Sequence, residues 1–452
     1  MKDGHATPAV QVPVVVYVES IMRTRWSRAT GIVVVLIALV VAIAAALWIP
    51  YWLAARIESV GVLTLVSVII FALVSAAGMA VLAKLWGPTF RRLYLMRGLA
   101  LVSAGFVIVQ YVVLLRPSSK IGPVTPYGTT RYWQLPTGSR IAYSEFDPPA
   151  GVAVRPFPIV FVHGGPGLRQ AAFDQRAYGP FADDGFRVFL YDQVGSGLSG
   201  FLPHVRDYTV QREVEDLEAV RVAIGAPKMI LIGHSWGSTL AAKYMAAHPG
   251  RVDKVVFHSP ARIWDVFADS VDYSRTDAAA GGLPSFRLLA ALFLRDRNPN
   301  TAENLLPQAE AEALFAPALL ATKGSIVCKG HSSDLPPEID SATNGSVNPG
   351  FNPYVLQQLA SEVSDSAADP HAALRSNDTP AILLYPECNY LSWNGSLDYR
   401  RTFRHLEIFY FPKAGHYIQL EQPELMHRVI RAFLLDQPDA IPPYTGDTDP
   451  RK

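Results

Sequence analysis

Residues 229–248 read Met229-Ile-Leu-Ile-Gly-His-Ser-Trp-Gly-Ser-Thr-Leu-Ala-Ala-Lys-Tyr-Met-Ala-Ala-His248. The run begins with four apolar residues, as in a short buried strand, and continues at helical spacing after a Gly-x-Ser-x-Gly turn. Gly233 and Gly237 flank a bend that is too sharp for neighbouring Cβ atoms, and such a bend presents Ser235 in a strained, exposed conformation. The order of strand, turn and helix predicts that Ser235 is a nucleophile beside the positive end of a helix dipole.

Composition limits the class of protein. The chain has 452 residues, of which 50% are apolar, and its formal net charge of +1 gives no reason to expect a nucleic-acid partner. Three uncharged stretches near the N-terminus, residues 31–55, 61–83 and 98–115, each have at least 18 residues, the length that spans a bilayer as a helix. We therefore predict a transmembrane region of three helices over residues 30–116, with the lipid bilayer as a partner.

The basic residues predict an orientation. They gather before the first apolar stretch and between the second and the third: Arg23, Arg25, Arg28, Lys84, Arg91, Arg92 and Arg97. Because basic loops stay in the cytoplasm, residues 1–29 are expected to be a cytoplasmic tail and the chain after the third helix to lie outside the cytoplasm, in a multi-pass protein of the cell membrane. In that oxidising compartment, Cys328 and Cys388 are either a disulfide or two buried thiols.

The rest of the chain predicts an α/β fold. After a linker at residues 117–130, a hairpin is expected at residues 131–146, and apolar strands then alternate with helical segments. This alternation, with continuously apolar strands, is typical of a mostly parallel sheet with helices on both faces. We therefore predict an α/β domain over residues 131–452, with a helical cap inserted at about residues 260–376.

Ser235 needs a base and a group that orients the base. On folds with this turn, the partners follow in the order serine, acid, histidine. His416 lies between the last predicted strand and the last predicted helix, so it is the predicted base. The backbone amides of Gly164 and Gly165, which follow the first parallel strand, are predicted to form an oxyanion hole together with the amide of Trp236.

Three motifs carry a family resemblance. Together, His163-Gly-Gly-Pro-Gly167, Asp192-Gln-Val-Gly-Ser-Gly-Leu-Ser199 and Gly233-His-Ser-Trp-Gly-Ser-Thr-Leu240 resemble the proline iminopeptidase branch of the α/β-hydrolases. The resemblance covers residues 158–260 well and residues 380–434 at superfamily level. It implies an α/β-hydrolase sheet, Ser235 as nucleophile, His416 as base, and oxyanion donors at Gly165 and Trp236. No metal and no cofactor are expected.

The acid departs from the family pattern. The family has an aspartate a few residues after the strand at residues 381–385, where this chain has Asn389. Three alternatives stay open: Asn389 itself orients His416, Glu387 does so from two residues earlier, or Asp265 takes over from beyond the preceding strand. In a serine protease triad, an Asp-to-Asn change lowers kcat about 10⁴-fold because the imidazole takes the wrong tautomer, so Asn389 alone predicts a slow enzyme.

The predicted function is a membrane-anchored serine hydrolase acting on small peptides, amides or esters. Aminopeptidases of this branch bind the amino terminus of the substrate with cap carboxylates, and Glu303, Glu310 and Glu312 are either such groups or a solvated acidic helix face. The departure at Asn389 and the added helices favour a second hypothesis, a catalytically weak hydrolase fold that serves as a binding or sensing module at the membrane.

Overall fold

The computed structural model describes residues 14–86, 90–110, 124–126, 128–264, 286–308, 310–312, 323–331, 335, 350–365 and 369–452. The chain divides into two compact units. The helical unit comprises Met1–Pro117 with Leu289–Leu305, and the sheet unit comprises Ser118–Leu288 with Leu306–Lys452. Part of the predicted cap therefore belongs to the N-terminal helices. The domain limits predicted above stay predictions.

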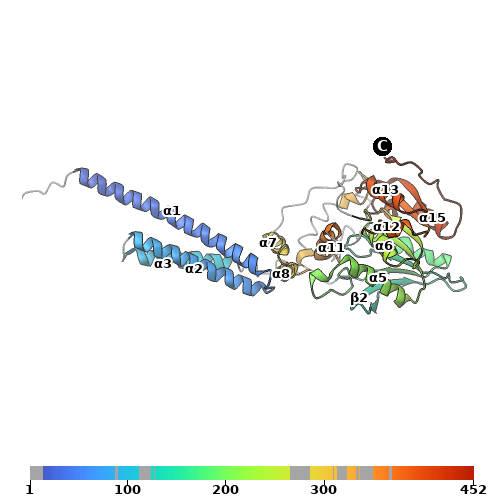
Figure 1. Ribbon diagram of the computed structural model, residues 1–452, viewed down its shortest axis with the longest axis horizontal. Coiled ribbons are helices and arrows are strands. Elements are labelled where there is room, and N and C mark those ends of the chain that lie inside the picture. The colour runs from blue at the N-terminus through green and yellow to red at the C-terminus, as the bar shows by residue number, and fades with distance from the viewer. Residues whose placement is uncertain are drawn as a thin grey trace, which may run out of the picture. The chain divides into compact units, whose positions relative to one another are not determined.

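The helical unit contains α1 (Val14–Leu53), α2 (Val60–Trp86), α3 (Phe90–Gln110), most of α7 (Phe286–Arg295) and α8 (Pro299–Leu305). In Figure 1, α1, α2 and α3 lie side by side. Phe71 of α2 stacks on Phe106 of α3, with ring centroids 4.1 Å apart. A Cβ added to Gly78 would lie 2.6 Å from the Cβ of Ala38, so this glycine lets α1 and α2 approach closely.

Among the described residues, two helices and not three are long and apolar enough to cross a membrane: Leu36–Leu53 and Val60–Val81. Only 17% and 22% of these segments are buried, so most of their apolar surface faces away from the protein. The described residues do not support the prediction of a third span, since that stretch contributes only the short apolar helix Ala100–Gln110 to them. Residues 111–115 of that predicted span lie outside the described residues. Two such helices are compatible with membrane spans and also with a signal sequence.

The sheet unit contains one mixed eight-stranded sheet, in the order β1-β2-β4-β3-β5-β6-β7-β8. The strands β1, β2 and β4 pair antiparallel, and every other pairing is parallel. The strands are β1 (Arg131–Gln134), β2 (Arg140–Phe146), β3 (Ile159–Val162), β4 (Val188–Tyr191), β5 (Met229–His234), β6 (Val252–His258), β7 (Ala381–Cys388) and β8 (Leu406–Gly415). The predicted mostly parallel sheet is confirmed.

Helices cover both faces of this sheet. On one face, Phe161, Ile232 and Leu384 join a core with Phe181 and Ile430. The helices of the sheet unit are α4 (Ala172–Tyr178), α5 (Val210–Ile224), α6 (Trp236–Ala247), α11 (Pro353–Asp365), α12 (His371–Arg375), α13 (Trp393–Thr402), α14 (Ile418–Glu421) and α15 (Pro423–Leu434), with short 3-10 helices at Gly179–Asp184, Val205–Asp207 and Lys323–Ser325. On the other face, the ring of Phe257 lies 4.6 Å from the ring of Tyr399 in α13. Because the central strands are buried on both faces, they read as continuous apolar runs.

The approach of α6 to β3 leaves no room for a side chain at Gly237. A Cβ there would lie 2.0 Å from the carbonyl oxygen of Val162. We expect Gly237→Ala to lower the free energy of unfolding of the sheet unit by about 3 kcal/mol, because the backbone must move to relieve the overlap. Thermal unfolding followed by circular dichroism measures the effect.

Gly395→Ala in α13 is the matched control, since its added Cβ would make only an ordinary contact of 3.4 Å with Arg262. Alanine favours a helix by about 1 kcal/mol over glycine, so this control is expected to be neutral or stabilising. Equal melting temperatures for the two variants would contradict the close packing of α6 on β3.

Candidate active site

Ser235 lies at the turn between β5 and α6, where the sequence predicts it. Its backbone has φ 54° and ψ −117°, a strained conformation for a residue with a side chain. The N–H of Ser235 donates to the carbonyl oxygen of His258 at 2.9 Å, which holds the turn against β6. A Cβ on Gly233 would lie 2.5 Å from the carbonyl oxygen of Gly237, so the turn can form only with glycine there. Ser235 retains 7% exposure at the carboxyl edge of the sheet.

The loop after β3 contacts this turn. A Cβ added to Gly164 would lie 3.1 Å from the Cβ of Ser235 and 3.0 Å from Nδ1 of His234. Gly165 has a φ of 128°, a backbone conformation that residues with side chains rarely adopt. The structure therefore brings Gly164, which Gly165 follows in the chain, to Ser235, whose next residue is Trp236.

A hydrogen-bonded network that the sequence did not reveal holds this loop. The backbone N–H of Gln193 donates to Nε2 of His163 at 2.9 Å, so the proton of that imidazole is on Nδ1, which donates to the carbonyl oxygen of Gly164 at 2.8 Å. The side chain of Gln193 donates to the carbonyl oxygen of His163 at 2.8 Å and accepts from the indole N–H of Trp236 at 3.1 Å. In a trans peptide, C=O and N–H point in opposite directions, so the N–H of Gly165 points away from His163.

His416 follows β8 and is buried beside the same turn. Nε2 of His234 donates to the carbonyl oxygen of His416 at 3.2 Å, and the two rings lie 4.8 Å apart. Nδ1 of His416 lies 2.9 Å from Oδ1 of Asn389. Burial, together with the neighbouring His234, lowers the pKa of His416 well below its usual value. The imidazole is therefore neutral at neutral pH, which is the state a general base requires.

The contacts of Asn389 decide the tautomer of His416. Oδ1 of Asn389 also accepts from the backbone N–H of Leu391 at 3.1 Å. A backbone N–H can only donate, so the atom that faces it is the amide oxygen and not the amide nitrogen. The same oxygen faces His416, so Nδ1 carries the proton and Nε2 keeps its lone pair. This is the tautomer that a carboxylate would impose, and it differs from the wrong tautomer expected for an asparagine.

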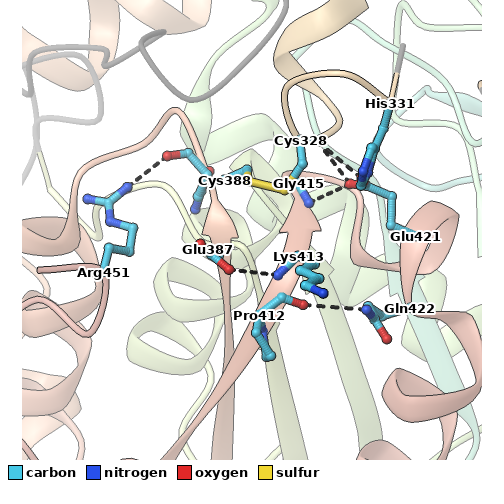
Figure 2. The surroundings of a disulfide bond; sticks show 11 residues. Cys328, His331, Glu387, Cys388, Pro412, Lys413, Gly415, Glu421, Gln422 and Arg451 are labelled. Atoms are coloured by element: carbon cyan, nitrogen blue, oxygen red, sulfur yellow. Dashed lines mark hydrogen bonds and ion pairs between the residues drawn. A yellow bond between two sulfur atoms is a disulfide. The ribbon is translucent and has the colours of Figure 1, made fainter. Parts of the chain in front are cut away.

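The structure does not bring Glu387 to His416. Its Oε2 accepts from the backbone N–H of Lys413 at 2.8 Å, as Figure 2 shows. The pairing of β7 is irregular after Pro386, and the N–H of Asn389 turns back to the carbonyl oxygen of Pro386 at 3.3 Å. Asp265 lies outside the described residues. Of the three alternatives, Asn389 is the one that the described part of the chain places at His416.

A disulfide joins Cys328 to Cys388, the residue before Asn389, with an S–S distance of 1.99 Å. Cys328 lies in the segment inserted between β6 and β7. The same segment reaches the His416 loop, because the N–H of Tyr417 donates to the carbonyl oxygen of Ile326 at 3.2 Å. The insertion is therefore tied both to the loop of Asn389 and to the loop of His416.

The carboxylate of Glu421 reinforces this connection (Figure 2). It accepts from the N–H of Gly415 at 2.6 Å and from the N–H of Cys328 at 3.2 Å. It also contacts Nδ1 of His331 at 2.5 Å. Gly415 is the residue before His416, so Glu421 links the backbone of the predicted base to the cysteine-bearing segment.

The C-terminal segment supports the loop of Asn389 from another side. Nη1 of Arg451 donates to the carbonyl oxygen of Asn389 at 2.9 Å. The guanidinium lies 5.3 Å from the ring centroid of Tyr385 and is paired with Asp449 at 2.7 Å. A contact between residues 62 positions apart has no local sequence signal, so it could not be predicted from the sequence.

Two of the predicted cap carboxylates are buried and engaged. Arg287 donates to both oxygens of Glu310, at 2.6 and 2.8 Å, and the N–H of Phe351 donates to Glu312 at 2.7 Å. Burial raises the pKa of Glu312 to about 7. The prediction of a solvated acidic face is wrong for Glu310 and Glu312, because partners from distant parts of the chain satisfy them. Glu303 is half-buried in α8 of the helical unit.

Other imidazoles at this edge are also neutral. Burial lowers the pKa of His163 and of His234 to about 4, and that of His258 well below its usual value. Nδ1 of His258 is bonded to the hydroxyl of Tyr178 at 2.7 Å. Within the described ranges, no group of three His, Cys, Asp or Glu side chains is arranged to hold a metal ion.

A family model described as alpha/beta hydrolase fold matches residues 158–423, which is more than half of the chain. The chain belongs to the α/β-hydrolase family. The match covers the whole of the structure from β3 through the turn at Ser235 to His416 and α14.

Curated relatives of this α/β-hydrolase are proline iminopeptidases. The chain is 35% identical over 132 residues to that of Heyndrickxia coagulans, covering 28% of this chain and 43% of the relative. It is 38% identical over 125 residues to that of Neisseria gonorrhoeae, covering 28% and 38%. The matches thus span less than half the length of these relatives. They confirm the resemblance that the three motifs indicate.

Solved structures of similar fold include a proline iminopeptidase of Mycobacterium smegmatis, with a TM-score of 0.48 and 20% identity over 68% of this chain and 98% of that one. A putative aryl esterase from Burkholderia cenocepacia has a TM-score of 0.48 and 19% identity over the same shares.

The disulfide of this hydrolase closes a loop between positions 60 residues apart. We expect the double variant Cys328→Ala/Cys388→Ala to lower the free energy of unfolding by about 4 kcal/mol, because the unfolded chain regains the entropy that the bridge removes. Urea unfolding followed by circular dichroism measures the change. Wild-type protein treated with a reductant is the control and should match the variant. Two free thiols in the unreduced, denatured protein would contradict the bridge.

Proposed function

We propose that this α/β-hydrolase is a serine hydrolase with Ser235 as nucleophile, His416 as general base and Asn389 as the group that orients His416. The observation that carries the proposal is the contact of 2.9 Å between Nδ1 of His416 and Oδ1 of Asn389, beside the strained turn of Ser235. It supplies the oriented, neutral base that a serine hydroxyl requires.

In the proposed reaction, Oγ of Ser235 attacks the carbonyl carbon of an ester or amide while Nε2 of His416 accepts the hydroxyl proton. The electron pair of the carbonyl moves to its oxygen, which the N–H groups of Gly165 and Trp236 stabilise. The tetrahedral intermediate then loses the alcohol or amine, which takes the proton from Nε2. Water repeats the sequence on the acyl-enzyme and releases the acid.

Asn389 orients His416 but carries no charge. Its oxygen selects the productive tautomer, but a neutral amide provides no ion pair for the imidazolium that forms when Nε2 accepts a proton. Turnover is therefore slower than with a carboxylate. This property supports the second candidate function, a catalytically weak binding or sensing module.

Esters and simple amides are the substrates that the cap favours. The curated relatives are proline iminopeptidases, so small peptides with an N-terminal proline or apolar residue belong to the same panel. However, Glu310 and Glu312 hydrogen-bond to the chain itself, which argues against their capturing the amino terminus of a peptide. The neutral amide bonds or esters of small substrates need no such carboxylate.

We further propose that the helical unit anchors the enzyme in a membrane. Two apolar helices expose most of their surface, and Trp48 and Trp52 near the end of α1 are 54% and 60% exposed, as in an aromatic belt at a membrane surface. A disulfide in the sheet unit is consistent with an oxidising, extracytoplasmic compartment for that unit.

Labelling with a fluorophosphonate probe tests the nucleophile. We expect Ser235→Ala to abolish labelling and to lower kcat/KM for p-nitrophenyl esters at least about a thousandfold. The nearby hydroxyl of Ser238 does not replace it, because it donates to the carbonyl oxygen of Gly233 at 2.6 Å. Ser376→Ala is the matched control, since this exposed serine only donates to the carbonyl oxygen of Ala373. Equal labelling of the wild type and Ser235→Ala would end the assignment.

Asn389→Asp tests the orienting group. A carboxylate at this position stabilises the imidazolium and raises the pKa of His416, so we expect kcat to rise about ten- to a hundredfold. Because kcat/KM falls when His416 is protonated, the raised pKa moves this fall to higher pH. The pH profiles of kcat/KM for the wild type and the variant measure the shift.

Asn389→Leu is the matched control, because it removes the oxygen acceptor at similar size. It leaves both tautomers of His416 accessible and is expected to lower kcat. An Asn389→Asp variant with an unchanged pH profile would show that Asn389 does not orient the base. Absence of turnover by every variant on esters and proline arylamides would favour the binding module.

A further inference from the structure

An open cavity with a volume of about 120 Å³ lies within the helical unit. Helices α1, α2, α7 and α8 contribute apolar walls, among them Leu47, Leu63, Phe293 and Leu305. None of the described residues that line the cavity is charged.

A proline in α1 starts a chain of hydrogen bonds at this cavity. Pro50 lies inside α1 and has no N–H, so it cannot bond to the carbonyl oxygen of Ala46 four residues earlier. The hydroxyl of Ser67 in α2 takes that place and donates to Ala46 at 2.8 Å. The proton of Ser67 is thereby used, and its oxygen can only accept a further bond.

That further bond fixes the amide of Gln110. Nε2 of Gln110 donates to Oγ of Ser67 at 3.1 Å. Because Oγ can only accept, the amide nitrogen must face Ser67 and the amide oxygen must point elsewhere. Gln110 is only 7% exposed and lines the cavity, and its Oε1 has no hydrogen-bond partner. The other lining hydroxyl in α2, that of Thr64, donates to the carbonyl oxygen of Val60 at 2.8 Å.

We propose that the cavity binds an uncharged lipid that has one apolar chain and a hydroxyl or amide N–H, and that this donor bonds to Oε1 of Gln110. The apolar walls fit the chain, and none of the described lining residues carries a charge that could pair with an ionic headgroup. A buried carbonyl oxygen without a partner is unfavourable in an apolar environment, and a ligand donor removes that cost.

The cavity also has a wall from the segment inserted between β6 and β7. The ring of Phe293 in α7 lies 4.4 Å from that of Tyr51, and Arg297 lies 3.5 Å from the ring centroid of Trp52. Nδ2 of Asn300 in α8 donates to Glu58 at 3.0 Å. These contacts hold α7 and α8 on the end of α1, so a lipid in the cavity contacts the same insertion that carries Cys328.

Photolabelling of the full-length protein in dodecyl maltoside micelles tests the proposal. The probe is a long-chain fatty alcohol with a diazirine in its chain, and labelled peptides are mapped by mass spectrometry. We expect labels on the cavity-lining parts of α1, α2 and α7. Oleyl alcohol should compete about five- to tenfold better than oleyl methyl ether, which has the same chain but no donor.

The variants separate the donor bond from the cavity itself. Gln110→Met should reduce the advantage of the alcohol over the ether to less than about twofold. Ser75→Ala, which removes a buried hydroxyl of α2 outside the cavity, is the matched control and should leave the advantage unchanged. Ala290→Phe fills the cavity from α7 and should lower labelling by the probe at least about fivefold.

Equal competition by the alcohol and the ether in the wild type would overturn the role of Gln110. Labels spread along the outer faces of α1 and α2, and unaffected by Ala290→Phe, would overturn the cavity as the site. No catalysis is measured, so these outcomes are independent of the labelling of Ser235.

Discussion

The active site depends on how closely α6 approaches the ends of β3 and β5. The carbonyl oxygen of Val162 occupies the space that a side chain at Gly237 would need, and the carbonyl of Gly237 occupies the space beside Gly233. Only a chain with glycine at both positions can make this turn, and the turn forces Ser235 into its left-handed conformation. The same approach places Gly164 against Ser235, so one packing constraint brings together the nucleophile and the loop expected to stabilise its oxyanion.

A second set of constraints holds His416 and Asn389 in place. These constraints act on Gly415 and Cys388, the residues that come directly before them in the chain. The disulfide holds Cys388, next to Asn389, and Glu421 holds Gly415, next to His416. Both connections end on the short segment around Cys328. Because β7 and β8 also pair with each other, the loops of Asn389 and His416 are fixed both by the sheet and by this segment. The imidazole and the amide are therefore held in contact although no charge attracts them.

Local chemistry explains what could be predicted from the sequence. Ser235, the parallel strands and the position of His416 follow from glycine spacing, apolar runs and chain order, and each is a property of a short stretch. The choice between Asn389 and Glu387 could not be made, because it depends on where the chain leaves β7. The turn from Pro386 to Asn389 ends the alternation of strand side chains and sends the two residues to different partners.

Contacts between distant segments account for the other differences between the structure and what the sequence predicts. Glu310 and Glu312 follow a helical pattern with charges expected in solvent, but Arg287 and the backbone of Phe351 approach them from elsewhere and make burial favourable. Gln193 lies in the motif at residues 192–199, yet its link between His163 and Trp236 exists only after β3, β4 and β5 have paired. Of the third apolar stretch, the described part of the chain contains only Ala100–Gln110, which is shorter than a span.

Asn389 and Gln110 illustrate one principle in two settings. An amide offers an oxygen and a nitrogen of similar shape, and its function depends on which of them is directed where. At Asn389 a backbone N–H that can only donate selects the oxygen, and at Gln110 a serine oxygen that can only accept selects the nitrogen. In both cases the amide supplies an acceptor without a charge, which suits a buried imidazole that must stay neutral and an apolar cavity that cannot stabilise an ion. A carboxylate at either position would add a charge that its surroundings must then compensate, and this difference gives a physical reason for an amide at each site.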